Sequence, residues 1–321
     1  MTDGIDVVGV GLITTDYVYR VPHLPAFGQS LRASGYVRAC GGPAATAMAC
    51  LARLGIGARF VGKTGDDAEG DFVAAELSRA GVDVSRLRRG SGHSRVATVL
   101  VDEDSGERGL LSWPESFSPL RGCDIAVEDL ADARVVLIDD ADEAGLEVAR
   151  QARAAGAIVV FDGTWQSDLL DEFLPLVDHA IVSEFFARRW MPDVSDNAIL
   201  QRLTDLGAGT AVLTLGPRGC VARVEQEHLA CSAAPVAVVD TTGAGDAFHG
   251  GYIAALLEER DLPQRLHFAA ATAALNCRAL GGQQALPTRG EVEDLQKTWP
   301  PPKCFHPFCA RDHRDSPRRG R

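Results

Sequence analysis

Residues 238–252 read VVDTTGAGDAFHGGY, and this stretch decides how the rest of the chain is interpreted. Two glycines, Gly243 and Gly245, flank Ala244, and Asp246 follows them where a helical pattern begins. Glycines before a helix let backbone N–H groups approach a phosphate, because no Cβ is in the way and the helix N-terminus carries partial positive charge. An aspartate beside phosphate indicates a base that takes a proton from an attacking hydroxyl. The alternative is a first-turn carboxylate that only complements the helix dipole.

The overall composition favours a globular protein that binds a small ligand. The chain has 321 residues, of which 46% are apolar and 24% charged, so it can bury the core of one large domain. Its formal net charge of −12 argues against a nucleic-acid partner, which would need a concentrated basic surface. We find no signal-like segment and no apolar run of about 18 residues, so we expect a cytoplasmic protein without a membrane partner.

Apolar runs and helical patterns alternate along most of the chain, which predicts an α/β fold with a mostly parallel central sheet. The expected strands lie at 5–11, 58–65, 134–139, 157–163, 179–184 and 210–216. The expected helices lie at 43–54, 67–80, 142–155, 197–206, 247–258, 262–280 and 288–299. Residues 12–40 and 94–113 instead read as hairpins and predict a small separate sheet, which is either a lid over the carboxyl ends of the main strands or a plain surface ribbon.

A second stretch, GGPAATAMACLARLG at 41–55, also places a glycine pair before a helix. Together with DTTGAGDAFHGGY it resembles the two signatures of the ribokinase-like (PfkB) carbohydrate kinases, and the likeness runs from about Val7 to Pro287. The resemblance implies a three-layer α/β/α kinase domain over residues 1–299 with a β-sheet lid. It also implies ATP-dependent transfer of the γ-phosphate to a sugar hydroxyl. Residues 300–321 are basic and contain prolines, and we expect a disordered tail there.

The resemblance also assigns roles to individual residues of this sequence. It implies that Asp246 is the base and that an anion hole is formed by the N–H groups of Gly243, Ala244 and Gly245. It implies sugar contacts from Asp16, Gly41, Gly42, Thr46 and Ser112, besides Asp246. It implies ATP contacts from Thr214, Gly216, Gly219 and Asn276, besides Gly243 and Gly245. For Asn276, a capping or surface amide is the alternative.

The resemblance also indicates where metal ions would bind. The family commonly carries an asparagine and a glutamate near Mg²⁺ and the phosphates, whereas this chain has Ser183 and Phe186 at those positions. Glu184 is then the remaining acidic candidate, and we expect Mg²⁺ to be held mainly through water and nucleotide phosphates. Asp240 and Thr242 lie where many members bind a monovalent cation such as K⁺.

Finer motif details most resemble sulfofructose kinases, with ketohexokinases next. The positions that match the sulfonate-binding arginine and asparagine read Ala141 and Ser112, so we expect a ketose or related sugar, with Arg38 or Arg108 as candidate partners for an anionic group. Alternative functions are a nucleoside kinase of the same superfamily and a non-catalytic sugar or nucleotide sensor. We also expect a homodimer through the lid, because a small inserted sheet leaves unpaired edges.

Overall fold

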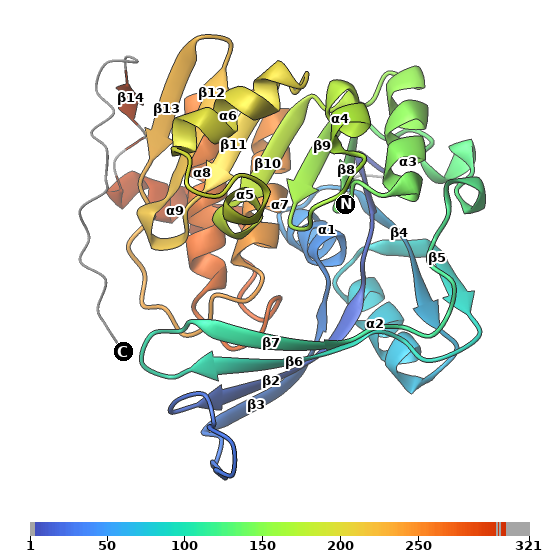
Figure 1. Ribbon diagram of the computed structural model, residues 1–321, viewed down its shortest axis with the longest axis vertical. Coiled ribbons are helices and arrows are strands. Elements are labelled where there is room, and N and C mark those ends of the chain that lie inside the picture. The colour runs from blue at the N-terminus through green and yellow to red at the C-terminus, as the bar shows by residue number, and fades with distance from the viewer. Residues whose placement is uncertain (1–3, 300, 302, 306–321) are drawn as a thin grey trace.

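The computed structural model describes residues 4–299, 301 and 303–305, and its main element is a ten-stranded sheet (Figure 1). In spatial order the strands are β14 (Lys303–Phe305), β13 (Glu227–Cys231), β12 (Cys220–Val224), β11 (Thr210–Thr214), β10 (His179–Ser183), β9 (Ile158–Gly163), β8 (Val135–Ile138), β1 (Val7–Val10), β4 (Ala58–Gly65) and β5 (Asp83–Gly90). The seven strands from β11 to β5 in this order are parallel to one another. Strands β12, β13 and β14 each pair antiparallel with the strand before them in the sequence.

Helices cover both faces of this sheet, because its central strands are apolar on both sides. Val7 points into the core on one face and Val8 into the core on the other. The helices on the face of Val7 are α1 (Pro43–Arg53), α2 (Ala68–Arg79), α7 (Ala244–Leu257), α8 (Leu262–Asn276) and α9 (Arg289–Thr298). Those on the face of Val8 are α3 (Glu143–Ala154), α4 (Leu170–Phe173), α5 (Glu184–Trp190) and α6 (Asp196–Asp205). Short 3-10 helices are η1 (Gly122–Asp124), η2 (Val127–Asp129), η3 (Leu174–Leu176) and η4 (Gly216–Arg218).

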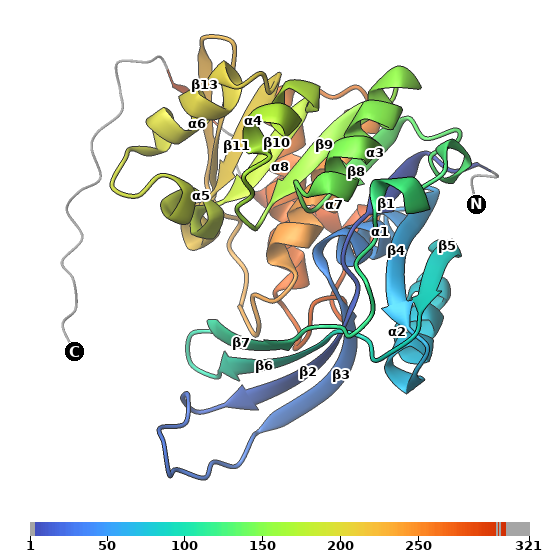
Figure 2. The ribbon, with the colours of Figure 1, turned by 45° about the vertical axis from the view of Figure 1, so that its right-hand side comes forward.

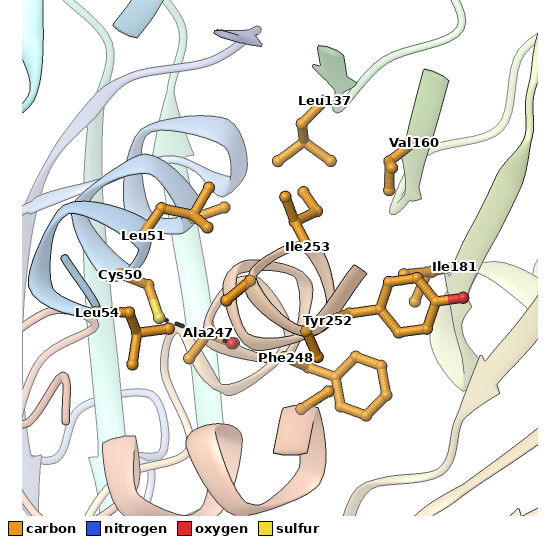
Figure 3. Close-up of a cluster of buried hydrophobic side chains, with 14 of the residues drawn as sticks. Cys50, Leu51, Leu54, Leu137, Val160, Ile181, Ala247, Phe248, Tyr252 and Ile253 are labelled. Atoms are coloured by element: carbon orange, nitrogen blue, oxygen red, sulfur yellow. Dashed lines mark hydrogen bonds between the residues drawn. The ribbon is translucent and has the colours of Figure 1, made fainter. Parts of the chain in front are cut away.

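Helix α7 lies in the middle of the core, and this fixes the turn that precedes it. Figure 3 shows Tyr252 of α7 beside Ile181 of the sheet and Ile253 pointing towards Leu137. A Cβ at Gly250 would lie 2.7 Å from the Cβ of Cys50 in α1, and one at Gly251 would lie 2.7 Å from Thr272 Oγ1 in α8. The glycine pair of the HGG segment therefore lets three helices pack closely.

A four-stranded sheet projects from the main body and forms the lid (Figure 2). Its strands, in spatial order, are β3 (Gly35–Gly41), β2 (Thr14–Val21), β6 (Val96–Asp102) and β7 (Arg108–Trp113). Asp16 pairs with Ala97, and Ala97 pairs with Ser112 on the next strand. Paired residues share a face, so one face, here called the inner face, carries Asp16, Ala97 and Ser112. Val18 and Val99 lie on the same inner face and are completely buried.

The structure confirms the predicted α/β class, its mostly parallel sheet and the lid. Helix α7 begins at Ala244, three residues before the predicted start, because Gly243 adopts a left-handed conformation and caps it. Within the predicted tail, residues 303–305 form β14 and pair with β13. Residues 306–321 of that tail lie outside the described residues. In the part of the chain that the structure describes, no helix is long and apolar enough to cross a membrane.

Candidate active site

The turn before α7 contains the three predicted anion-hole donors, one of which has a hydrogen-bond partner within the protein. Gly243 has φ +74°, and it caps α7 without a side-chain hydrogen bond. The Ala244 N–H donates to the carbonyl oxygen of Thr241 at 3.2 Å, so it is already engaged. Among the described residues, the N–H groups of Gly243 and Gly245 have no hydrogen-bond partner. Two of the three predicted anion-hole donors are therefore free at the N-terminus of a buried helix, where a phosphate group would be stabilised.

Asp246 lies in the first turn of α7, half-buried and close to other charged groups. The pKa of Asp246 is raised to about 8, mainly by burial and next by the nearby carboxylate of Asp162. Arg108 acts in the opposite direction, and Asp16 adds to the increase. A carboxyl group with a pKa near the working pH can accept a proton from an alcohol and release it again, which is what a general base requires.

Asp16 approaches the same place from the lid and is 6% exposed. Its Oδ1 accepts a hydrogen bond of 2.6 Å from Thr14 Oγ1, and a Cβ at Gly41 would lie 2.0 Å from its Oδ2. Burial raises the pKa of Asp16 to about 6, against the opposing effects of the Thr14 hydroxyl and of Arg108. Gly42 caps α1 with φ +99°, and a Cβ there would lie 2.3 Å from the carbonyl oxygen of Leu12. The glycine pair is therefore required by close backbone packing against Asp16 and Leu12.

The two other predicted sugar residues differ in their accessibility. Thr46 is 1% exposed, and its Oγ1 accepts a hydrogen bond from Gln283 Nε2 at 3.1 Å. Ser112 is exposed on the inner face of the lid, in the same row as Asp16. The structure thus brings Ser112 to the side where a sugar would lie, and it gives Thr46 a partner within the protein.

The predicted nucleotide residues gather after β11. Thr214 ends that strand, Gly216 has φ +56° with open space around it, and Gly219 has φ +87° with no room for a Cβ. Glu184 at the start of α5 accepts hydrogen bonds from Arg188 and, at 2.6 Å, from Arg218 of this turn. Its carboxylate therefore ties α5 to the turn after β11. Phe186 is completely buried, and Ser183 caps α5.

Asn276 and Asp240 hold the loop that follows α8. Asn276 is completely buried, and its Nδ2 donates to the carbonyl oxygens of Thr242 and Gly282 at 3.4 and 2.8 Å. Its amide nitrogen therefore anchors this loop to the turn before α7. Asp240, also completely buried, accepts hydrogen bonds from the N–H and Oγ1 of Thr242 and from the N–H of Gly281.

The structure adds Asp139 to the site, and it shows a contact of Arg108, the candidate partner for an anionic group, with the segment before α7. Arg108 on β7 donates to the carbonyl oxygen and to Oγ1 of Thr241, both at 3.1 Å, so it ties the lid to the catalytic segment. Asp139 follows β8, and its Oδ2 accepts from the N–H groups of Leu12 and Ala44, which fixes the start of α1. The only local signal for Asp139 is a carboxylate after an apolar strand. Arg38, the other arginine considered for an anionic substrate, pairs with Glu69 of α2.

Comparisons with known proteins agree with this geometry. Residues 5–289 match the family described as pfkB family carbohydrate kinase. The chain is 28% identical to a ribokinase of Haemophilus influenzae, covering 88% of this chain and 95% of the relative, and 29% identical to fructokinase-1 of Zea mays, covering 90% and 97%. The structure of Arabidopsis thaliana ribokinase complexed with ribose and ATP superposes with a TM-score of 0.76 at 28% identity, covering 91% and 99%. The chain therefore belongs to the pfkB family of carbohydrate kinases, ATP-using phosphotransferases with a hydroxyl group as the acceptor.

Proposed function

We propose that this protein transfers the γ-phosphate of ATP to a hydroxyl group of a ketose or related sugar. The observation that carries the proposal is the convergence of Asp16 and Asp246, which are 230 residues apart in sequence. The charge of Asp16 helps to raise the pKa of Asp246, and Arg108 acts to lower the pKa of both carboxyl groups. Asp16 belongs to the lid and Asp246 to the catalytic helix. A sugar bound between them would have one carboxylate to orient its hydroxyls and another to take the proton.

The mechanism follows from the charges and donors at the start of α7. Asp246 removes the proton of the acceptor hydroxyl as its oxygen attacks the γ-phosphorus, and the bond to the ADP leaving group breaks. The free N–H groups of Gly243 and Gly245 stabilise the negative charge on the transferring phosphoryl group. Positioning and electrostatic stabilisation supply most of the catalysis in this class of reaction. Asp16, held by Thr14, accepts hydrogen bonds from other hydroxyls of the sugar.

The inner face of the lid favours a sugar over a nucleoside. Base recognition would need aromatic side chains on the side of Asp16. Tyr17 neighbours Asp16, and Trp113 neighbours Ser112, so both point to the opposite face, here called the outer face. Tyr19 and Tyr36, which pair with each other, lie on the outer face as well. The four lid aromatics therefore face away from the site, which argues against the nucleoside kinase alternative.

The finer identity of the sugar is argued from the relatives and from Arg108. The relatives above are named ribokinase and fructokinase, whereas the motif details resemble sulfofructose kinases and ketohexokinases. Arg108 is a cation near Asp16 and Asp246, but two of its hydrogen bonds already go to Thr241. We therefore propose an uncharged sugar as the acceptor, with Arg108 holding the lid against the catalytic turn.

Two cations accompany the proposal. The Glu184 carboxylate has two arginine partners, so it does not fit a direct Mg²⁺ ligand, and Mg²⁺ would enter with ATP and be held by its phosphates and by water. Asp240 fits a monovalent cation better: it is a completely buried carboxylate, and among the described residues it forms no ion pair. We propose that K⁺ binds near Asp240 and the carbonyl oxygens of the adjoining loop.

The proposed reaction is tested by measuring ADP formation with Mg·ATP and a panel of free sugars, phosphorylated sugars and nucleosides. We expect turnover with one or a few free sugars, more in potassium than in sodium buffer, and a phosphorylated sugar detectable by mass spectrometry. Binding of sugar and ATP without any phosphorylated product would instead support the sensor alternative. Turnover confined to nucleosides would contradict the argument from the lid aromatics.

We also propose that two copies of the chain associate through the outer face of the lid. Apolar side chains are exposed there: Tyr36 by 55%, Leu111 by 69% and Trp113 by 59%. The edge strands β3 and β7 add unpaired backbone groups. Large exposed apolar patches commonly mark an interface.

For this interface we expect the purified protein to sediment as a dimer and Leu111→Glu to sediment as a monomer, because a carboxylate cannot be buried there without a partner. Val127→Glu is the matched control, since Val127 is 61% exposed but lies in η2, away from the lid. A parent protein that stays monomeric at tens of micromolar would rule out the interface.

A further inference from the structure

His249 lies one turn after Asp246 in α7 and is 3% exposed. Its Nδ1 is 2.8 Å from the carbonyl oxygen of Gly245, and its Nε2 is 3.3 Å from the carbonyl oxygen of Ile181 in β10. Both neighbours are hydrogen-bond acceptors. A neutral imidazole has one donor and one acceptor nitrogen, so it would turn a lone pair towards one of the two carbonyls. The imidazolium form donates to both and is the form that fits this environment.

Asp162 supplies the opposite charge. It ends β9 and is 4% exposed, and its Oδ1 accepts a hydrogen bond of 3.0 Å from Thr164 Oγ1. Its Oδ2 has no hydrogen bond and lies 3.4 Å from Nδ1 of His249. A buried carboxylate without a cation costs several kcal/mol, and so does a buried imidazolium without an anion. Each group therefore explains how the other can be charged in the interior.

The pair lies directly behind the catalytic turn. The carbonyl of Gly245, which His249 contacts, belongs to the residue immediately before Asp246. The charged and titratable groups around Asp246 come from four other elements: Asp162 from β9, Asp16 from β2, Arg108 from β7 and the Cys50 thiol from α1. Arg108 is the only cation in this set, so a proton on His249 would add a second one.

We propose that Asp162 and the protonated ring of His249 form a buried ion pair that positions Asp246 and sets the pH range in which Asp246 acts as a base. Both are positioning residues, because they act through Asp246 and the turn. The kinetic part of this inference rests on the proposed function, whereas the charge of His249 does not. Burial raises the pKa of Asp162 and the charge of His249 opposes this, so without His249 the pKa of Asp162 rises further. At a pH above that pKa, the uncompensated charge of Asp162 disfavours the ionised form of Asp246. Without Asp162, an imidazolium that remains has the opposite effect.

The charge of His249 is tested in the parent protein by NMR of its ¹⁵N-labelled imidazole rings, with His249→Asn used to assign the signal. We expect both nitrogens of His249 to carry protons at pH 7. His179 is an internal reference, since burial and Arg265 lower the pKa of His179 to about 4 and its ring must then be neutral at pH 7. A neutral ring at position 249 would overturn the proposal without any need for a variant that folds.

The effect on Asp246 is tested by the pH profile of kcat/KM. We expect His249→Asn to move the acid limb of the profile to higher pH by about one unit. On that limb, kcat/KM at a given pH would then be about tenfold lower than in the parent. We expect Asp162→Asn to move the limb to lower pH by a similar amount. The double variant should return towards the parent profile, because both charges are gone. His228→Asn, on the strand β13 far along the sheet, should leave the profile in place.

Opposite shifts of the acid limb in His249→Asn and Asp162→Asn cannot come from a loss of packing alone. Lost packing would lower the activity of both variants without moving the acid limb. If Asp246→Asn is inactive and neither single variant moves the limb, the ion pair is wrong and the kinase proposal stands. If Asp246→Asn keeps the parent rate, the proposed base is wrong, and the NMR result alone decides whether the pair is charged.

Discussion

Asp246→Asn is expected to lower kcat by about 10³-fold, because an amide cannot accept the proton of the attacking hydroxyl and a positioned base contributes roughly 10²–10⁴-fold. The affinity for ATP should stay within a few-fold of the parent, since the N–H groups of Gly243 and Gly245 are unchanged. The measurement is single-turnover phosphoryl transfer with the best sugar of the panel, together with ATP binding by calorimetry. Retention of the parent rate would show that another group takes the proton.

The same carboxyl group predicts how activity and stability depend on pH. The pKa of Asp246 is raised to about 8, so kcat/KM should rise with pH up to that value in the free enzyme. The folded protein keeps this proton between about pH 4 and 8, whereas the unfolded chain releases it near its ordinary pKa of 3.8. The folded state therefore loses stability as pH rises through this window. The amide has no such loss, so Asp246→Asn should gain thermal stability relative to the parent as pH approaches 8.

This stability readout also separates catalysis from misfolding. A variant that is nearly inactive but melts at or above the parent temperature has lost its base and kept its fold. Glu143→Gln is the matched control, because Glu143 is likewise an acidic residue in the first turn of a helix, α3, but is exposed and has no role in the site. Its kcat should remain within twofold of the parent.

The fold and the glycine turn with Asp246 could be predicted from the sequence because their signals are local. Glycines, a helix start and Asp246 lie within a few residues of each other, and apolar runs mark the central strands. Strand β5 was not predicted, because it lies at the edge of the sheet and its arginine-rich segment, DVSRLRRG, has no apolar run. Strands β12 and β13 have five residues each and form a hairpin too short to give a clear pattern.

Side-chain roles that depend on distant partners could not be predicted in the same way. Asn276 was expected at the adenine, and its buried position follows from the carbonyls of Thr242 and Gly282, which only the fold brings to it. The link between Glu184 and Arg218 joins elements 34 residues apart. The environment of His249 likewise depends on Ile181 of a neighbouring strand. Local sequence patterns contain no information about such contacts.

Gly243→Ala is the substitution expected to damage the anion site most. Its Cβ would lie 2.4 Å from the carbonyl oxygen of Gly282 and 2.8 Å from the Cα of that residue, so the turn or the loop must move. The neighbouring donors, in particular the Gly245 N–H, would move with the turn. Loss of a donor aimed at the developing charge costs roughly 10²–10³-fold in kcat, and we expect a fall of that size. Single-turnover rates at saturating ATP and sugar would measure it.

The added methyl group of Gly243→Ala also strains the backbone, and this effect must be separated from the clash with Gly282. Gly243 has φ +74°, where any L-residue is strained by about 1 kcal/mol. Gly156→Ala isolates this strain, because Gly156 has φ +80° and a Cβ at this position would meet no other atom within 4 Å. Both variants should lose similar conformational stability in urea unfolding, apart from the clash at Gly243, but only Gly243→Ala should lose activity. Equal kcat values in the two variants would mean that the turn tolerates displacement, and the phosphoryl group would then have to be stabilised elsewhere.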